Sequence, residues 1–166
     1  MTLAATALAA AGDTATVRAL ADSVQRIAAN SSFGRDYLLH HFLHGLLLQR
    51  QNRHAEAVAA FRRSLFSLTD GYTRTNLELA RSLVVLHRYP EAIATLQPAL
   101  RGGVDGGNTY VTHTELHEAL AQAFDAAGQR DSAAVHFAAV ERAWRYADPQ
   151  FAARYRTARA RAAPSN

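Results

Sequence analysis

GLLLQRQNRHAEAVAAF, residues 45–61, decides the fold, because its arrangement of small and large residues occurs three times in the chain. The stretches ARSLVVLHRYPEAIATL at 80–96 and AQAFDAAGQRDSAAVHF at 121–137 repeat it. In each copy a small residue is followed by a large one three residues later, a small one after twelve and a large one after sixteen. The residues in this register are Gly45, Leu48, Ala57 and Phe61, then Ala80, Leu83, Ala92 and Leu96, then Ala121, Phe124, Ala133 and Phe137.

The register predicts pairs of helices that cross closely. Apolar positions recur at intervals of three and four residues, which is typical of amphipathic helices. The small residues fit the points where two helices cross, and the large ones fill the space between neighbouring hairpins. One hairpin alone leaves an apolar face exposed, so the hairpins must stack. A fainter fourth copy of the register is formed by Ala5, Leu8, Val17 and Ala21. A glycine-rich break is expected at 101–108. Helices are expected at about 2–11, 14–29, 36–51, 54–69, 73–87, 90–101, 111–127, 130–147 and 149–162.

The openings of the second helices carry a family resemblance. RHAEAVAAF at 53–61 and RYPEAI at 88–93, with a weaker match in GQRDSA at 128–133, resemble the start of the second helix in tetratricopeptide repeats. The resemblance implies an all-α, right-handed α-solenoid of three to four helix-turn-helix hairpins with a C-terminal capping helix. The expected organisation is a degenerate N-terminal helical hairpin at 1–37, three repeats at 38–71, 73–108 and 111–147, and a basic capping helix with a short tail at 148–166.

The same resemblance implies a concave groove lined by the first helices, which changes from apolar, through basic and apolar, to acidic. The helix at 36–51 is apolar on nearly every side, so it has to be covered. A ligand, the N-terminal hairpin or a neighbouring domain would each cover it, and an uncovered patch would favour self-association through the N-terminal helices. The expected groove residues are Leu39, Phe42, Leu46, Gln49 and Arg50, then Arg74, Leu77, Arg81, Val84 and Val85, then Glu115, Glu118, Gln122 and Asp125.

Members of this family usually hold a peptide or an amphipathic helix of another protein, which implies a non-catalytic interaction scaffold. Similar arrays are appended to bacterial transcriptional activators and Ser/Thr kinases, so a sensor or regulatory module of a bacterial signalling protein is expected. Residues 1–11 are apolar but lack a positively charged start, which favours a helix over a signal peptide. With no apolar run long enough to span a membrane, a cytoplasmic protein without a membrane partner is predicted.

The net charge of +4 lies in the last 26 residues, where six arginines face Glu141 and Asp148. A basic terminal helix can attach to nucleic acid, which makes a nucleic-acid-binding helical repeat the first alternative. The favoured interpretation is a solvated last helix whose cations suit the helix dipole, so a nucleic-acid partner is not expected.

Eight histidines suggest a second alternative, a metal enzyme. His40 and His44, and likewise His113 and His117, are four residues apart, a spacing that can place two imidazoles on one metal. No third ligand is identifiable, the chain has no cysteine, and no nucleophile or phosphate-binding motif occurs. We therefore predict no catalytic residue, no cofactor and no metal site.

Overall fold

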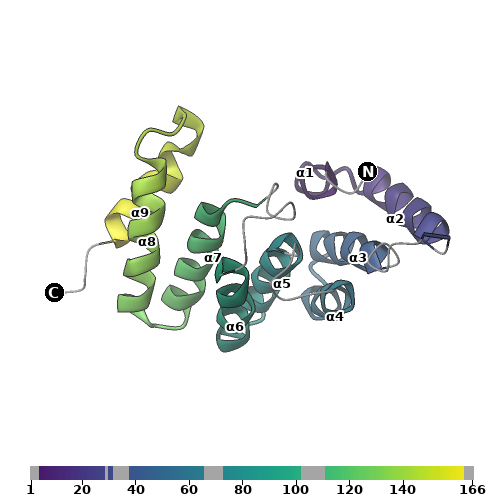
Figure 1. Cartoon of the computed structure of the whole chain (residues 1–166), viewed down its shortest axis with the longest axis horizontal. Coiled ribbons are helices and arrows are strands. Elements are labelled where there is room, and N and C mark those ends of the chain that lie inside the picture. The colour runs from purple at the N-terminus through teal and green to yellow at the C-terminus, as the bar shows by residue number, and fades with distance from the viewer. Residues whose placement is uncertain (1–3, 29, 32–37, 66–72, 102–110, 163–166) are drawn as a thin grey trace.

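The computed structural model describes residues 4–28, 30–31, 38–65, 73–101 and 111–162, and within these ranges the chain is helical and contains no strand. Figure 1 shows the helices following one another along a curved row. The all-α class expected from the sequence is confirmed. The elements are α1 (Ala5–Ala10), α2 (Thr14–Ala28), α3 (Leu39–Arg50), α4 (His54–Ser64), α5 (Thr73–Val85), α6 (Tyr89–Arg101), α7 (His113–Ala126), α8 (Arg130–Trp144), the 3₁₀ turn η4 (Pro149–Phe151) and α9 (Ala152–Arg161).

Each predicted helix has a counterpart. The expected residues 66–69 of the fourth helix and most of the glycine-rich break, 102–108, lie outside the described residues. α6 begins at Tyr89 with Pro90 in its first turn, where a missing N–H costs no helical hydrogen bond, and it continues past Pro98. The last predicted helix is divided into η4 and α9, because Phe151 donates its backbone N–H to the Asp148 carbonyl, three residues back, in a 3₁₀ turn at 2.9 Å.

Helices that are adjacent in the chain pack against each other from α1 to α9. The first helices of the hairpins, α1, α3, α5 and α7, also touch one another from hairpin to hairpin. They therefore form one continuous face of the row, which is where the sequence places the groove.

The four hairpin turns share one geometry. The residue seven positions after the first small residue of the register is left-handed in each, with φ of 85° at Gly12, 59° at Asn52, 58° at His87 and 74° at Gly128. The next residue donates its backbone N–H to a carbonyl five residues back, which is the Schellman arrangement that closes a helix. The first hairpin, faint in sequence, thus has the same turn as the others. These bonds run at 2.8–2.9 Å from Asp13 to Leu8, from Arg53 to Leu48, from Arg88 to Leu83 and from Gln129 to Phe124.

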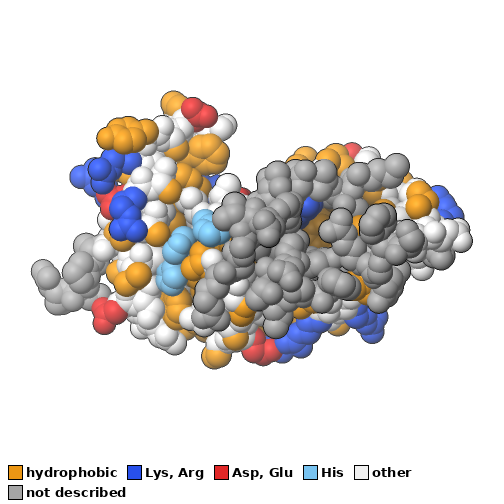
Figure 2. Space-filling view, viewed as in Figure 1, with side chains coloured by type: hydrophobic (Ala, Val, Ile, Leu, Met, Phe, Trp, Pro, Cys, Tyr) orange, Lys and Arg blue, Asp and Glu red, His pale blue; other side chains and the backbone are white. Residues whose placement is uncertain are grey.

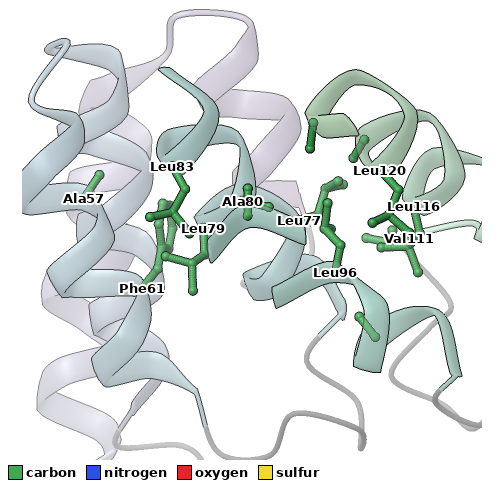
Figure 3. Close-up of a cluster of buried hydrophobic side chains, with 14 of the residues drawn as sticks. Ala57, Phe61, Leu77, Leu79, Ala80, Leu83, Leu96, Val111, Leu116 and Leu120 are labelled. Atoms are coloured by element: carbon green, nitrogen blue, oxygen red, sulfur yellow. The ribbon is translucent and has the colours of Figure 1, made fainter. Parts of the chain in front are cut away.

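Gly45 shows why the register requires a small residue. A Cβ placed on Gly45 would lie 2.6 Å from Cδ1 and 2.8 Å from Cζ of Phe61, so only glycine lets this ring lie against α3. Phe61 gathers with Leu79 and Leu83 where α4 meets α5 (Figure 3). Leu48 packs against this core, and all the other register residues of the three repeats are buried, namely Gly45, Ala57, Phe61, Ala80, Leu83, Ala92, Leu96, Ala121, Phe124, Ala133 and Phe137.

Gly45→Ala tests this contact. Overpacking against Phe61 costs about 1–3 kcal/mol, of which about 1 kcal/mol is offset by the better helix propensity of alanine. Phe61→Leu removes the ring and reproduces the pair that Ala80 and Leu96 form one repeat later. We expect Gly45→Ala to lower the free energy of unfolding in the wild type and to raise it in the Phe61→Leu background, as measured by urea denaturation. Equal effects of Gly45→Ala in both backgrounds would contradict the proposed contact.

His87→Gly tests the shared turn. A left-handed conformation costs an L-residue about 1 kcal/mol that glycine does not incur, so this substitution should stabilise the protein by about 0.5–1 kcal/mol. The gain should appear although the His87 ring loses its 2.5 Å contact with the Tyr89 hydroxyl, since that contact is exposed. Ala94→Gly, at an exposed position of α6, is the control and should destabilise by about 1 kcal/mol. Thermal unfolding followed by circular dichroism measures both, and a loss of stability in His87→Gly would refute the role of the turn.

Candidate functional site

Two clefts lie along the face of the first helices, one between α5 and α7 and the other between α7 and α9. Their volumes are about 240 and 250 Å³. Both are lined by the same positions of the register, one, four, five and sixteen residues after the first small residue. The repeat in sequence is therefore also a repeat of surface shape. These positions are Arg81, Val84, Val85 and Leu96 in the first cleft, and Gln122, Asp125, Ala126 and Phe137 in the second.

The cleft between α5 and α7 combines an arginine with two apolar side chains. Val85 is 54% exposed and Val84 is half-buried. The Arg81 guanidinium lies 2.7 Å from the buried Glu78 carboxylate, yet the Arg81 side chain remains 48% exposed. Gln122 is exposed at the α7 side of the cleft. These groups can hold an apolar side chain beside a hydrogen-bond acceptor of a ligand.

Gln49 occupies the corresponding place between α3 and α5. Its side-chain Nε2 donates hydrogen bonds to the Glu78 carbonyl at 3.0 Å and to the Ser82 hydroxyl at 2.9 Å. Gln49 thus links two first helices at the register position that Val84 takes one repeat later. Arg50, in the register position of Val85, is exposed next to it.

Three residues expected to line an open groove are buried. Phe42, Leu46 and Leu77 are 4%, 2% and 3% exposed, so this part of the expectation needs correction. α1 and α2 pack against α3, so among the three ways of covering that helix the N-terminal hairpin is the one observed. The Phe42 ring also packs on Phe61 of α4, with ring centres 5.9 Å apart, and Leu77 of α5 belongs to the hydrophobic core cluster. Leu39 is half-buried at the start of α3. The half-buried Arg74 lies with its guanidinium carbon 5.5 Å from the centre of the Phe42 ring, in a cation–π contact.

The acidic end of the expected groove is neutralised within the chain. Glu118 forms an ion pair with Arg154, with Arg154 Nε donating to Glu118 Oε1 at 3.0 Å, and Asp125 pairs with Arg161. Glu115 accepts the backbone N–H of Thr112 at 2.9 Å in a capping box, so it serves the start of α7. Of the four acidic or polar residues expected in this part of the groove, Glu118 and Asp125 are thus ion-paired within the chain and Glu115 caps α7, whereas Gln122 is exposed. Sequence reasoning placed the arginines of the last helix in water and missed these two pairs.

α9 is held by polar contacts and one buried alanine. Arg154 lies over the Trp144 ring with its guanidinium carbon 4.0 Å from the ring centre, and the rings of Trp144 and Phe151 are 5.5 Å apart. Ala158 is fully buried, whereas the other residues of α9 are half-buried or exposed. The Arg154–Glu118 pair is part-buried, with side chains 37% and 14% exposed, and the Arg161–Asp125 pair is more exposed, so the ionic contribution to the docking of α9 is modest and falls as salt is added. Its ion pairs also occupy two of the six arginines on which nucleic-acid binding would depend.

The histidines come together differently from the predicted pairs. His117 of α7 faces His136 of α8 with the two Nδ1 atoms 2.8 Å apart, and the His136 ring is stacked 5.5 Å from that of Phe124. Histidine side chains gather on this part of the surface in Figure 2. The rings of His40 and His44 are edge-on, with centroids 6.2 Å apart. Within the described residues, no group of three or more histidine, aspartate or glutamate side chains is arranged to hold a metal ion.

Burial makes the facing histidines weak bases. Burial lowers the pKa of His117 below its ordinary value of 6.5, and the charges of His113 and Arg142 act in the same direction. Burial and the neighbouring His117 lower the pKa of His136. The geometry fits two neutral rings in which one Nδ1 carries a hydrogen and donates it to the other Nδ1. Hydrogens on both Nδ1 atoms would point at each other.

No family model, curated protein or solved structure matches this chain. Among the helices of the described residues, none is long and apolar enough to cross a membrane.

Acidification should loosen the α7–α8 hairpin. Because the pKa values of His117 and His136 are lowered on folding, the unfolded chain binds more protons below about pH 6.5, and stability falls as the pH drops through that value. His136→Phe keeps the aromatic stack on Phe124 and removes one titrating group. The Tm difference between about pH 7.5 and about pH 5 should shrink by roughly 1–3 °C in this variant. His87→Gln, at an exposed turn, is the control, and an equal change in both variants would contradict the assignment.

Proposed function

We propose that the chain is a right-handed, tetratricopeptide-like α-solenoid that binds a peptide or helix of another protein on the face of its first helices. The observation that carries this proposal is the cleft between α5 and α7, where Arg81, Val84 and Val85 reach the surface at groove positions of the register. The recurrence of turns, buried small residues and clefts in one register supports the repeat assignment.

The composition of the cleft defines a ligand with one or two apolar side chains and an acceptor group for Arg81. Burying two apolar side chains contributes about 3–6 kcal/mol to binding. The entropy lost on association and on ordering of the ligand offsets much of this gain. The expected dissociation constant is therefore in the micromolar range or weaker, which suits a reversible regulatory contact. A cytoplasmic sensor or regulatory module of a bacterial signalling protein is the setting that the family resemblance favours.

Val85→Asp is the test, because this side chain is exposed and its replacement leaves the core intact. The measurement is a crosslinked pull-down from nuclease-treated lysate of the source cell at moderate salt. The amount of partner captured by Val85→Asp should be about tenfold lower than that captured by the wild type, since burying a carboxylate next to Val84 is costly. Val135→Asp is the matched control, because Val135 is 69% exposed on α8, away from the cleft.

Both variants must first show wild-type helical circular dichroism. Arg81→Glu should reduce the capture of the same protein. Capture that is equal for wild type, Val85→Asp and Val135→Asp, or no capture by the wild type, would refute binding at this cleft.

A further inference from the structure

α9 packs against α8, and its arginines reach acidic residues of α7 as those of a further first helix would. The two ion pairs, Glu118 with Arg154 and Asp125 with Arg161, each span 36 residues, close to the 35 residues between Gly45 and Ala80. In each helix the paired residues are seven apart, which is two helical turns, so they lie on one face and the two helices run in the same direction. Ala158, fully buried between the two arginines, is the small residue of this contact.

α9 does not fill the space beside α7 and α8 completely. The cleft of about 250 Å³ between α7, α8 and α9 is space that α9 leaves open beside the buried Phe137 and Val140. Thr157, an exposed residue of α9, lines this cleft. The arginine side chains that hold α9 are 37% and 52% exposed, so salt and solvent weaken both pairs.

We infer that the surface of α7 and α8 beneath α9 is a receptor seat for an arginine-bearing helix of another protein, and that α9 is its occupant within the chain. The ligand helix carries two arginines seven residues apart for Glu118 and Asp125. Between them it has a small residue in the place of Ala158 and a larger apolar residue in the place of Thr157, which enters the cleft. This seat is separate from the cleft between α5 and α7, and the inference does not depend on that site.

A second copy of the chain is not the expected occupant. Its α9 has the same residues and the same unfilled cleft, whereas the chain's own α9 is present at an effective concentration of about millimolar. Only a helix that fits better than α9 displaces it, and filling the cleft is the way in which the structure permits a better fit.

The test uses the full chain and a fluorescein-labelled peptide of residues 148–162 that carries Thr157→Leu. Fluorescence anisotropy should show saturable binding, about fivefold to tenfold tighter than that of the unsubstituted peptide, because leucine buries apolar surface in the cleft. Trp144, the single tryptophan, reports displacement, since α9 takes Arg154 away from its ring. Its emission should move to longer wavelength as the peptide binds.

Charge variants separate the seat from non-specific attraction of a basic peptide. Glu118→Gln/Asp125→Asn should weaken peptide binding by about tenfold, whereas Glu56→Gln/Asp22→Asn, which removes the same charge elsewhere, should leave it unchanged. The full chain with Arg154→Gln/Arg161→Gln, in which α9 lacks its two ion pairs with α7, should bind the peptide more tightly than the wild type.

Equal binding to both acid variants would overturn the proposal in favour of non-specific attraction. Absence of binding to the wild type and to Arg154→Gln/Arg161→Gln would overturn it as well. Light scattering that shows a wild-type dimer, lost in Arg154→Gln/Arg161→Gln, would assign the seat to α9 of a second copy instead of a different protein.

Discussion

The distance between the two helices of each hairpin is set by one small residue, and the rest of the structure depends on it. At Gly45 the ring of Phe61 lies where a Cβ would stand, so the side chain of α4 is accommodated against the backbone of α3. Ala80 and Ala121 occupy this position in the next two hairpins, with Leu96 and Phe137 as the large residues sixteen positions later. A fixed hairpin spacing lets successive hairpins stack in one register, and the stacking brings the first helices together on one face.

The helices and their register could be predicted because they depend on local spacing. Arg81, Val84 and Val85 of the cleft were expected through the family resemblance, which implies a groove lined by the first helices. The left-handed turn at His87 could not be predicted, because histidine adopts that conformation more often than most side chains but far less often than glycine, which is too weak a signal to place a turn. The burial of Phe42 and Leu46 depends on how the neighbouring helices pack around α3, which no local pattern specifies.

The ionic groups of the first-helix face are largely balanced within the chain. Glu78 with Arg81, Glu118 with Arg154 and Asp125 with Arg161 pair across or along these helices. The last two pairs join residues far apart in sequence, so their signal was the shared spacing of seven residues in two helices and not any motif. The predicted gradient from basic to acidic is thereby reduced.

Clefts built from the same register positions differ in what occupies them. Between α3 and α5 the Gln49 amide bridges the helices, between α7 and α9 the two arginine pairs close over the opening, and between α5 and α7 the two valines stay exposed. The residues one, four and five positions after the small residue are not needed for the hairpin crossing, because the small residue and the large residue sixteen positions after it already determine the crossing. They are therefore the positions at which an array can vary its surface without changing its fold, and in this chain that variation leaves the cleft between α5 and α7 accessible while α9 covers its neighbour.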